Sequence, residues 1–339
     1  MKVVKVGNHC CIRLVKEAVA LISKGYEVHL VGFHKPNACE EDFASFSLCQ
    51  NNRQLLDTLR LHKDADLFHV HTEPYHLVMA IREAGITKPI ILDMHDSMEW
   101  RTDDPAKHVG EERLAISMSD GLVFPSKMCR DITNPSLPHC ILPPYVNERF
   151  YKLLDHLRLG GIALNGKADP PKEYDFMDYC KYEKLAKELK EAQIPFHIYT
   201  VWQNTEHLKF YEAISLPKPT LPYNSLLKSL GHHDWGLCGN LGQFKEWDVA
   251  MPNKLFEYLA AGIPVIAMNC KSVEEFVQEH QVGICVKSVQ EIKDRWDERF
   301  KCQANVFKTR QKFTMENNIS ILEKLYAEVL NGRNNAGNS

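Results

Sequence analysis

The segment Met251–Ala267, MPNKLFEYLAAGIPVIA, constrains the fold more than any other stretch because it predicts a helix and a buried strand with marked boundaries. Pro252 suits the first turn of a helix, where the missing N–H is not needed. Gly262 suits the left-handed conformation that ends a helix, and Pro264 prevents continuation. The apolar residues 265–268 that follow have the length and composition of a fully buried strand.

Polar side chains mark the start of this predicted helix. Asn253, Lys254 and Glu257 recur at helical spacing on one face, and apolar residues form the opposite face. The first turn of a helix has unpaired N–H groups and a partial positive charge, which favour an anion such as a diphosphate. An ordinary amphipathic helix with a surface Lys–Glu pair shows the same pattern, so both interpretations stay open here.

Length and charge exclude several classes of protein. A chain of 339 residues favours two domains over a single core. The formal net charge of −3 gives no support for a nucleic-acid-binding protein. No apolar run reaches the roughly 18 residues that span a bilayer, and the N-terminus begins with a strand pattern instead of a signal peptide.

The 11 cysteines are scattered along the chain, and none belongs to a C-x-x-C pair. An odd number without paired spacing favours reduced, mostly buried thiols over a disulfide framework. Reduced thiols are usual in the cytosol, where disulfides are rare. We therefore expect a cytoplasmic protein.

The first part of the chain alternates strand and helix patterns. Residues 3–6 form an apolar strand pattern, Gly7 and Asn8 suit a turn, and Ile12–Ser23 has one apolar helical face. A strand–turn–helix–strand unit of this length is typical of parallel α/β sheets. The turn lacks the G-x-G-x-x-G fingerprint, so we expect no dinucleotide cofactor.

Two further strand patterns, residues 67–70 and 89–92, run directly into polar side chains. His71 follows the first pattern, and His95 and Asp96 follow the second. Ligands bind at the carboxyl ends of strands in open α/β sheets. The three side chains are therefore candidate site residues.

The same region allows a metal site as an alternative interpretation. Histidine and carboxylate side chains gather there in a pattern that would suit zinc or a two-metal hydrolase. The candidate ligands are His69, His71, His76, Asp93, His95 and Asp96. The histidines lie in different turns, so only part of the set can converge, and a structural role is favoured for His69 and His76.

The order of these motifs resembles glycosyltransferases of the GT-B fold, in particular glycosyltransferase family 4 (group 1). The resemblance is specific in Met251–Ala267, which is similar to the C-terminal donor-binding signature of that family, and suggestive elsewhere up to Leu330. It implies an α/β fold of two Rossmann-like domains that face a cleft. The implied parts are an acceptor-side domain at 1–150, a nucleotide-sugar-binding domain at 151–304, a helix at 305–331 that returns to the first domain, and a disordered tail at 332–339.

In the donor site that this resemblance implies, Lys254 is a catalytic residue that stabilises the departing diphosphate. Pro252 and Asn253 bind the donor at the same helix start, and Glu257 binds the ribose hydroxyls. Many family members carry a Glu eight residues before this Glu, where this chain has Val249. That departure leaves open a GT-B protein that binds nucleotide without catalysis.

Further donor contacts are implied near the first loop and near the start of the second domain. Gly7 would contact the donor, and Lys167 and Lys172 stand where the family usually carries an Arg and a Lys that reach the diphosphate. Segments 221–227 and 233–237 occupy the place of the residues that line the base pocket.

On the acceptor side, the resemblance assigns His95 to the catalytic histidine that lies next to the transferred sugar. Asn8, His71 and Asp96 are the other acceptor-side candidates. All of these residues lie in the predicted first domain.

The activity implied is transfer of a hexose from a nucleotide-diphosphate sugar to an unidentified acceptor, with retention of configuration, in glycan biosynthesis. The acceptor would be a glycan, a lipid-linked molecule or a small molecule, with peripheral contact to a membrane among the expectations. No cofactor and no metal are expected beyond the nucleotide sugar. The alternatives are a metal-dependent hydrolase that uses the His69, His71, His95 and Asp96 cluster, or the binding-only protein.

Overall fold

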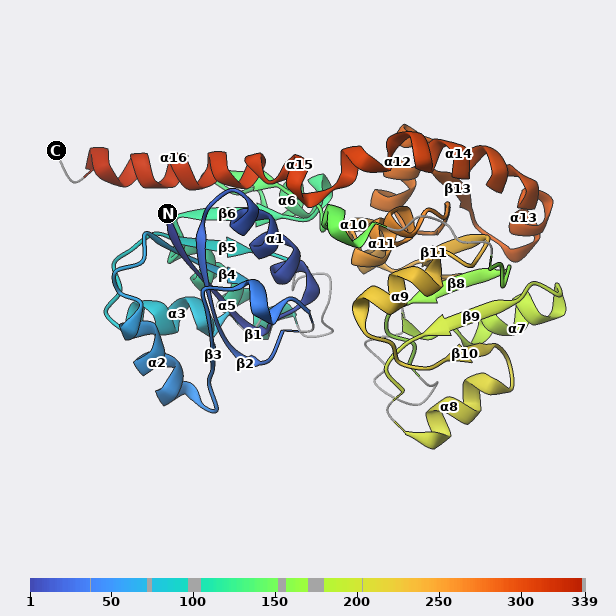
Figure 1. Ribbon diagram of the computed structural model, residues 1–339, viewed down its shortest axis with the longest axis horizontal. Helices are drawn as coiled ribbons and strands as arrows, with labels where there is room; N and C mark the ends of the chain where they lie inside the picture. The colour runs from blue at the N-terminus through green and yellow to red at the C-terminus, as the bar shows by residue number, and fades with distance from the viewer. Residues whose placement is uncertain are drawn as a thin grey trace. The chain divides into compact units, whose positions relative to one another are not determined.

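The computed structural model describes residues 1–36, 38–71, 75–96, 105–151, 157–169, 180–202 and 204–336. The chain divides into two compact units, Met1–Asn147 with Thr314–Ser339, and Glu148–Phe313. Each unit is a parallel β-sheet with helices packed against it (Figure 1). The predicted α/β class with two Rossmann-like domains is confirmed.

The described strands of the first unit form one parallel sheet in the order β3-β2-β1-β4-β5-β6-β7. Their bounds are β1 Lys2–His9, β2 Glu27–His34, β3 Ser45–Leu48, β4 Leu67–His71, β5 Ile90–Asp93, β6 Gly121–Phe124 and β7 His139–Ile141. The chain order reverses direction across the sheet between β1 and β4. Such a switch point is where open α/β sheets bind ligands.

Helices cover both faces of this first sheet. One face packs against α2 (Asn52–Leu61), α3 (His76–Glu83), α5 (Pro105–Ser117) and α6 (Lys127–Thr133). The other packs against α1 (Ile12–Ser23), α15 (Met315–Asn318) and α16 (Ser320–Ala336). In Figure 1, α16 is the long red helix that lies along the β6 side of this unit. It continues to Ala336, into the segment that the sequence predicted to be disordered.

The first strand is longer than predicted, which corrects the interpretation of Gly7 and Asn8 as a turn. β1 runs to His9, with Gly7 paired to Gly32 of β2 and to His71 of β4. A Cβ on Gly32 would lie 2.6 Å from the carbonyl oxygen of Gly7, and a Cβ on Gly7 would lie 3.1 Å from Leu14 of α1. The glycines thus allow close packing of strands and helix and do not make a turn.

The described strands of the second unit form a parallel sheet in the order β10-β9-β8-β11-β12-β13, with its switch point between β8 and β11. Their bounds are β8 Ile162–Asn165, β9 Phe196–Tyr199, β10 Leu216–Lys218, β11 Trp235–Gly239, β12 Val265–Met268 and β13 Gly283–Val286. Alternation along the strands places Ile162, Leu164 and Ile198 in the core under α7 (Glu183–Glu191) and α8 (Thr205–Glu212). Asn165 and Tyr199 therefore belong to the opposite face.

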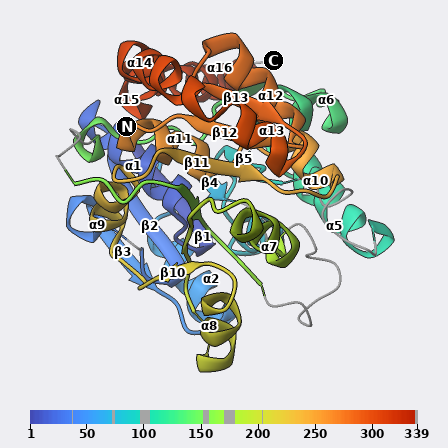
Figure 2. The same ribbon diagram turned by 90° about the vertical axis from the view of Figure 1, so that its right-hand side faces the viewer.

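Helices also pack against the sheet of the second unit. Those not yet given are α9 Tyr223–Leu230, α10 Lys245–Val249, α11 Asn253–Ala261, α12 Lys271–His280, α13 Val289–Asp294 and α14 Arg299–Thr309. Figure 2 shows α8 beside β10 at one end of the sheet and α12, α13 and α14 around β13 at the other. Among the described residues, no helix has both the length and the apolar composition needed to cross a membrane.

The segment Met251–Ala267 has the predicted conformation. Pro252 is the extended N-cap of α11, Gly262 ends the helix at φ +83°, and Val265–Met268 is the buried strand β12. None of the 11 cysteines, all of which belong to the described residues, forms a disulfide.

Candidate active site

The carboxyl end of β8 meets the start of α11 in the second unit. Nδ2 of Asn165 donates to Oε2 of Glu257 at 2.5 Å, and the backbone N–H of Asn165 donates to the hydroxyl of Tyr258 at 2.8 Å. Glu257 is buried, which disagrees with the alternative interpretation of a surface Lys–Glu pair on this helix. Sequence periodicity missed Asn165, because only its position at a strand end marks it.

A glycine on the neighbouring strand explains the position of Tyr258. A Cβ on Gly236 of β11 would lie 2.2 Å from the Tyr258 ring, so the ring packs directly onto the backbone there. Its hydroxyl also donates to the carbonyl of Leu237 at 3.1 Å. Burial raises the pKa of Tyr258 well above its usual value, so the hydroxyl stays protonated.

Lys254 projects from the first turn of α11 toward the β8 loop. A Cβ on Gly166 would lie 3.3 Å from Nζ of Lys254, and Gly166 has φ +128°. The ammonium lies 5.1 Å from the ring centroid of Trp247 and 5.8 Å from that of Tyr182. Within the described part of the chain it makes no hydrogen bond or ion pair, and burial lowers its pKa.

The composition of the first turn of α11 favours the binding of an anion. Pro252 supplies no side-chain cap, and the first turn contains no acidic residue. The helix therefore supplies no acidic side chain of its own first turn to the N–H groups there. Together with the ammonium of Lys254, they form a positively polarised site beside Gly166.

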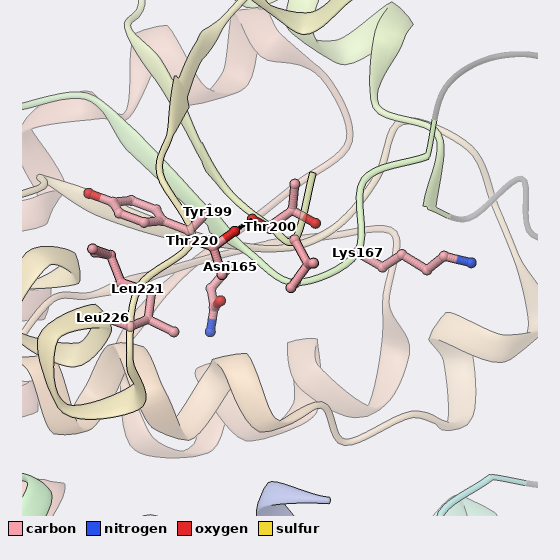
Figure 3. Close-up of a pocket in the computed structure, with 9 residues that line it drawn as sticks. Asn165, Lys167, Tyr199, Thr200, Thr220, Leu221 and Leu226 are labelled. Carbon is pink, nitrogen blue, oxygen red and sulfur yellow. Dashed lines mark hydrogen bonds between the residues drawn. The ribbon is translucent and has the colours of Figure 1, made fainter. Parts of the chain in front are cut away.

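A pocket of about 420 Å³ opens beside these residues, at the ends of β8 and β9 (Figure 3). Its lining comprises Asn165, Gly166, Lys167, Tyr199, Thr200, Val201, Thr220, Leu221 and Leu226. In Figure 3, Lys167 lies at one end, Asn165 and two threonines lie in the middle, and Tyr199 and two leucines lie at the other end. The lining thus changes from charged to polar to apolar along the pocket.

Tyr199 is held in its place in the lining by a buried histidine. Its hydroxyl lies 2.8 Å from Nε2 of His233, and Nδ1 of His233 lies 2.9 Å from the carbonyl oxygen of Gly160. The carbonyl accepts only from a protonated Nδ1, so Nε2 accepts from the tyrosine. His233, which the sequence placed near the base pocket, therefore acts through Tyr199.

Of the two lysines expected at the diphosphate, the structure describes only Lys167. Lys167 forms an ion pair with buried Asp169 at 2.9 Å and is 43% exposed. Its charge is therefore already balanced, in contrast to that of Lys254. Lys172 lies outside the described residues.

In the first unit, strand alternation places Lys5, His69, His71 and Asp93 on the face covered by α1 and α16. Lys5 is fully buried, and its Nζ lies 2.7 Å from Oε2 of Glu17, 3.0 Å from Nε2 of His71 and 3.3 Å from Nδ1 of His69. Tyr326 of α16 contacts Nδ1 of His69 at 2.7 Å. The strands and both helices thus meet in one buried polar cluster.

Burial and neighbouring charges set the protonation of this cluster. Burial raises the pKa of Glu17 to about 7, although Lys5 acts against this shift. Burial lowers the pKa of Lys5 and, well below the usual value, those of His69 and His71. Burial alone would raise the pKa of Asp93, but Arg13 and His95 hold it well below its usual range.

His95 lies at the edge of this cluster, with 16% of its side chain exposed. Its Nε2 is 3.4 Å from Nδ1 of His71 and 3.7 Å from Oδ2 of Asp93. Arg13 donates from Nε to the same carboxylate oxygen at 2.9 Å. Asp96 is half-buried, as is Asn8 near the end of β1.

The predicted metal ligands converge only in part. Glu17, His69, His71 and Asp93 bring ligand atoms within 4.8 Å of one another, and His76, His95 and Asp96 are not in this group. The ammonium of Lys5 lies among these side chains, where an ion would have to bind. The residues therefore do not fit a metal centre while Lys5 is charged. Sequence analysis missed Lys5, which occurs singly within an apolar strand, and Glu17, which lies beside Lys16 in the helix Ile12–Ser23.

Comparison with known proteins supports this architecture. Residues 176–316 match the sequence model of the C-terminal domain of the glucosyltransferase 3-like family. No curated protein sequence matches the chain. Three solved structures are described below. Their sequence identity to this chain is low, so the comparison shows a shared fold.

One of these is HepE from Anabaena in complex with UDP-glucose, with a TM-score of 0.70 and 11% identity over 98% of this chain and 100% of that one. A glycosyltransferase from Rickettsia africae has a TM-score of 0.67 and 13% identity over 97% and 98%. The UDP-forming α,α-trehalose-phosphate synthase from Burkholderia xenovorans has a TM-score of 0.63 and 12% identity over 96% and 100%. The chain therefore has the GT-B fold of glycosyltransferases.

Proposed function

We propose that this protein is a glycosyltransferase that binds a UDP-sugar in its second unit and transfers the sugar to an acceptor. The observation that carries the proposal is the graded pocket at the β8 and β9 strand ends, beside the positively polarised start of α11. Support comes from the match of residues 176–316 to a glucosyltransferase 3-like domain and from the UDP-glucose that HepE binds.

The graded lining suggests how the donor lies. The diphosphate binds at the start of α11, where N–H groups and the ammonium of Lys254 offer positive charge, with Pro252 and Asn253 in the same turn. The ribose hydroxyls donate to Glu257, whose side chain Asn165 already orients. The base enters the apolar end beside Tyr199 and Leu226.

The transfer step follows from this placement. As the bond between sugar and phosphate breaks, negative charge develops on the leaving diphosphate. Lys254, which has no carboxylate partner among the described residues, stabilises that charge more in the transition state than in the ground state. We therefore expect metal-independent transfer of a hexose, with retention of configuration as in glycosyltransferase family 4.

The first unit supplies the acceptor side in this proposal. The imidazole of His95 accepts a hydrogen bond from a sugar hydroxyl, while His71 and Asp93 hold the ring in place. Gly7 belongs to β1. Because glycine has no side chain, a donor contact from this residue would involve its backbone. Asn8 and Asp96 remain candidates for the acceptor hydroxyls.

A binding-only protein is the second candidate function. Val249, which stands where many family members carry a glutamate, is 2% exposed and belongs to the core. Its position in α10 therefore offers no carboxylate to the sugar. This candidate keeps the nucleotide pocket and predicts binding without turnover.

The decisive experiment separates binding from turnover. Isothermal titration with UDP, ADP and GDP should show binding of UDP. Release of UDP from a panel of UDP-sugars should then be measured with and without a mixed acceptor panel. Failure to bind any nucleoside diphosphate would refute the proposal, and binding without release on every donor would favour the binding-only protein.

A further inference from the structure

The outward face of α14 carries aromatic and basic side chains in a single stripe. Phe300, Ala304 and Phe307 recur at helical spacing, with Lys301 and Lys308 beside them, and all five are exposed. We call this set the α14 ridge. Cys302 and Val306 on the opposite face are buried. The ridge therefore belongs to the surface of the second unit, at whose edge Figure 1 shows α14.

The two rings of the α14 ridge remain accessible although neighbouring side chains cover part of each. Phe300 is 63% exposed and Phe307 is 39% exposed. The guanidinium of Arg299 lies 4.2 Å from the ring centroid of Phe300, and that of Arg310 lies 4.6 Å from the ring centroid of Phe307. Such stacking fixes the orientation of the rings. Arg310 is buried and Arg299 pairs with Asp297 and Asp234, so the free positive charge of this surface comes from the lysines.

The charge of this segment is entirely positive. Residues 299–313, RFKCQANVFKTRQKF, contain lysines and arginines but no aspartate or glutamate. Lys301 and Lys308 make no hydrogen bond or ion pair with any residue that the structure describes. The preceding acids are balanced, because Asp297 pairs with Arg299 at 2.6 Å and Glu298 with Arg295 at 2.7 Å. The ridge therefore presents uncompensated cations beside exposed aromatic rings.

We propose that the α14 ridge binds the surface of an anionic lipid bilayer. Lysines attract acidic headgroups while phenylalanine rings enter the boundary between headgroups and acyl chains. A convex helix stripe rich in lysine suits this surface better than a protein partner, because lysine is depleted in protein interfaces. The proposal is independent of the donor site, since no residue of the ridge lines the pocket.

The first test measures binding of the full chain to vesicles by flotation. Vesicles of phosphatidylcholine with an equal part of phosphatidylglycerol should carry the protein upward at about 0.1 M NaCl, where the Debye length is about 10 Å. Vesicles of phosphatidylcholine alone should carry little. Raising the salt to 0.5 M should release the protein, because screening weakens its attraction to the headgroups. Absence of binding to the anionic vesicles would overturn the proposal.

The second test uses matched variants. Each of Lys301→Gln and Lys308→Gln should lower the partition coefficient about fivefold, the effect of one cation near an anionic surface. Phe300→Ser should also lower it, because insertion of the ring is lost. Leu61→Ser with Lys63→Gln is the control, since Leu61 is 79% exposed and Lys63 is exposed in the first unit.

Thermal melting of all variants should match that of the wild type, because the changed side chains are at the surface. Equal vesicle binding by the ridge variants and the control would place the membrane contact elsewhere and refute the proposal. If the wild type instead forms a dimer that Phe300→Ser abolishes, and ignores vesicles, the ridge is a protein interface and the proposal is also refuted.

Discussion

Asn165 and Glu257 are joined by a hydrogen bond of 2.5 Å between Nδ2 and Oε2, which links the end of β8 to α11. One residue closes a strand and the other lies in a helix 92 positions later in the chain. The bond orients a buried carboxylate at the edge of the pocket that we assign to the donor. The ribose is the part of the donor that this carboxylate would recognise.

Replacing Glu257 by Ala should weaken UDP binding by about 10- to 100-fold, the scale of hydrogen bonds to a charged group. The donor KM should rise more than kcat falls, because ribose contacts are equal in the ground and transition states. Isothermal titration of UDP and 2′-deoxy-UDP provides the measurement. The wild type should prefer UDP, and the variant should lose that preference.

Glu191→Ala, at an exposed position of α7, is the control and should bind UDP like the wild type. If Glu257→Ala keeps the preference for UDP over 2′-deoxy-UDP, the proposal that Glu257 binds the ribose hydroxyls is wrong. The assignment of the pocket to the nucleotide would still hold if UDP binds to the protein.

Lys254→Ala should lower kcat by roughly 10² or more, as expected for the loss of one electrostatic stabiliser of a developing charge. Lys167→Ala should lower it by less, because Asp169 already balances the charge of Lys167. Steady-state release of UDP measures both effects. If Lys167→Ala proves the more damaging change, the assignment of the leaving group to Lys254 is wrong.

Activity should survive excess EDTA, since protein groups alone stabilise the leaving diphosphate in this proposal. The measurement is UDP release after dialysis against EDTA, with added Mg²⁺, Mn²⁺ or Zn²⁺ as comparison. Complete loss in EDTA and recovery with one divalent ion would contradict the mechanism and restore the metal alternative.

Lys5→Ala should destabilise the first unit by about 3–5 kcal/mol, because the variant removes the nearest cation from the buried carboxylate of Glu17 and leaves it with Arg13 at 3.5 Å. The variant should also gain affinity for Zn²⁺, since Glu17, His69, His71 and Asp93 then surround a space without an ammonium. Thermal melting with and without Zn²⁺ tests both effects, because a bound ion raises stability by mass action.

Lys2→Ala in the same strand is the control, because its ion pair with Asp64 is at the surface and contributes little. Zinc should stabilise only the Lys5 variant. Stoichiometric binding of zinc by the wild type would show that Lys5 does not exclude a metal.

Acid should destabilise the second unit through two buried histidines. Burial lowers the pKa of His197 to about 3 and that of His233 to about 4. The unfolded chain therefore binds protons below pH 6.5 that the folded chain does not bind, so stability is full above pH 6.5 and falls as the pH decreases. For His197 alone, the loss from pH 6.5 to 5 is roughly 2 kcal/mol.

The two histidines should respond oppositely to replacement by Leu. Neither ring nitrogen of His197 has a hydrogen-bond partner among the residues that the structure describes, so His197→Leu should stabilise the unit by about 1 kcal/mol and flatten the pH dependence. His233→Leu should destabilise by about 1–3 kcal/mol, because Tyr199 and the carbonyl of Gly160 lose their partner. Urea unfolding followed by tryptophan fluorescence reports on this unit, which contains four of the five tryptophans. Equal effects of both changes would refute the distinction.

The sequence by itself determined the features that depend on neighbouring residues. The bounds of α11 and β12 follow from Pro252, Gly262 and Pro264, whose backbone preferences act locally, and the structure has the helix and strand that these residues predict. Alternating strand and helix patterns likewise indicated the parallel α/β class, because a buried parallel strand and an amphipathic helix have distinct periods.

Tertiary structure alone decided which side chains meet. Lys5, His69 and Tyr326 belong to β1, β4 and α16, and no local pattern shows that they share one buried cluster. The length of β1 was predicted wrongly because Gly7 resembles a turn residue until Gly32 is seen beside it. Lys167 and Asp169 are only two residues apart, but the burial of Asp169, which makes it a close partner for Lys167 and leaves Lys254 as the better-placed cation, also appeared only in the tertiary structure. The physical reason is that burial and charge pairing depend on segments brought together by packing, whereas caps and periodicity act within one segment.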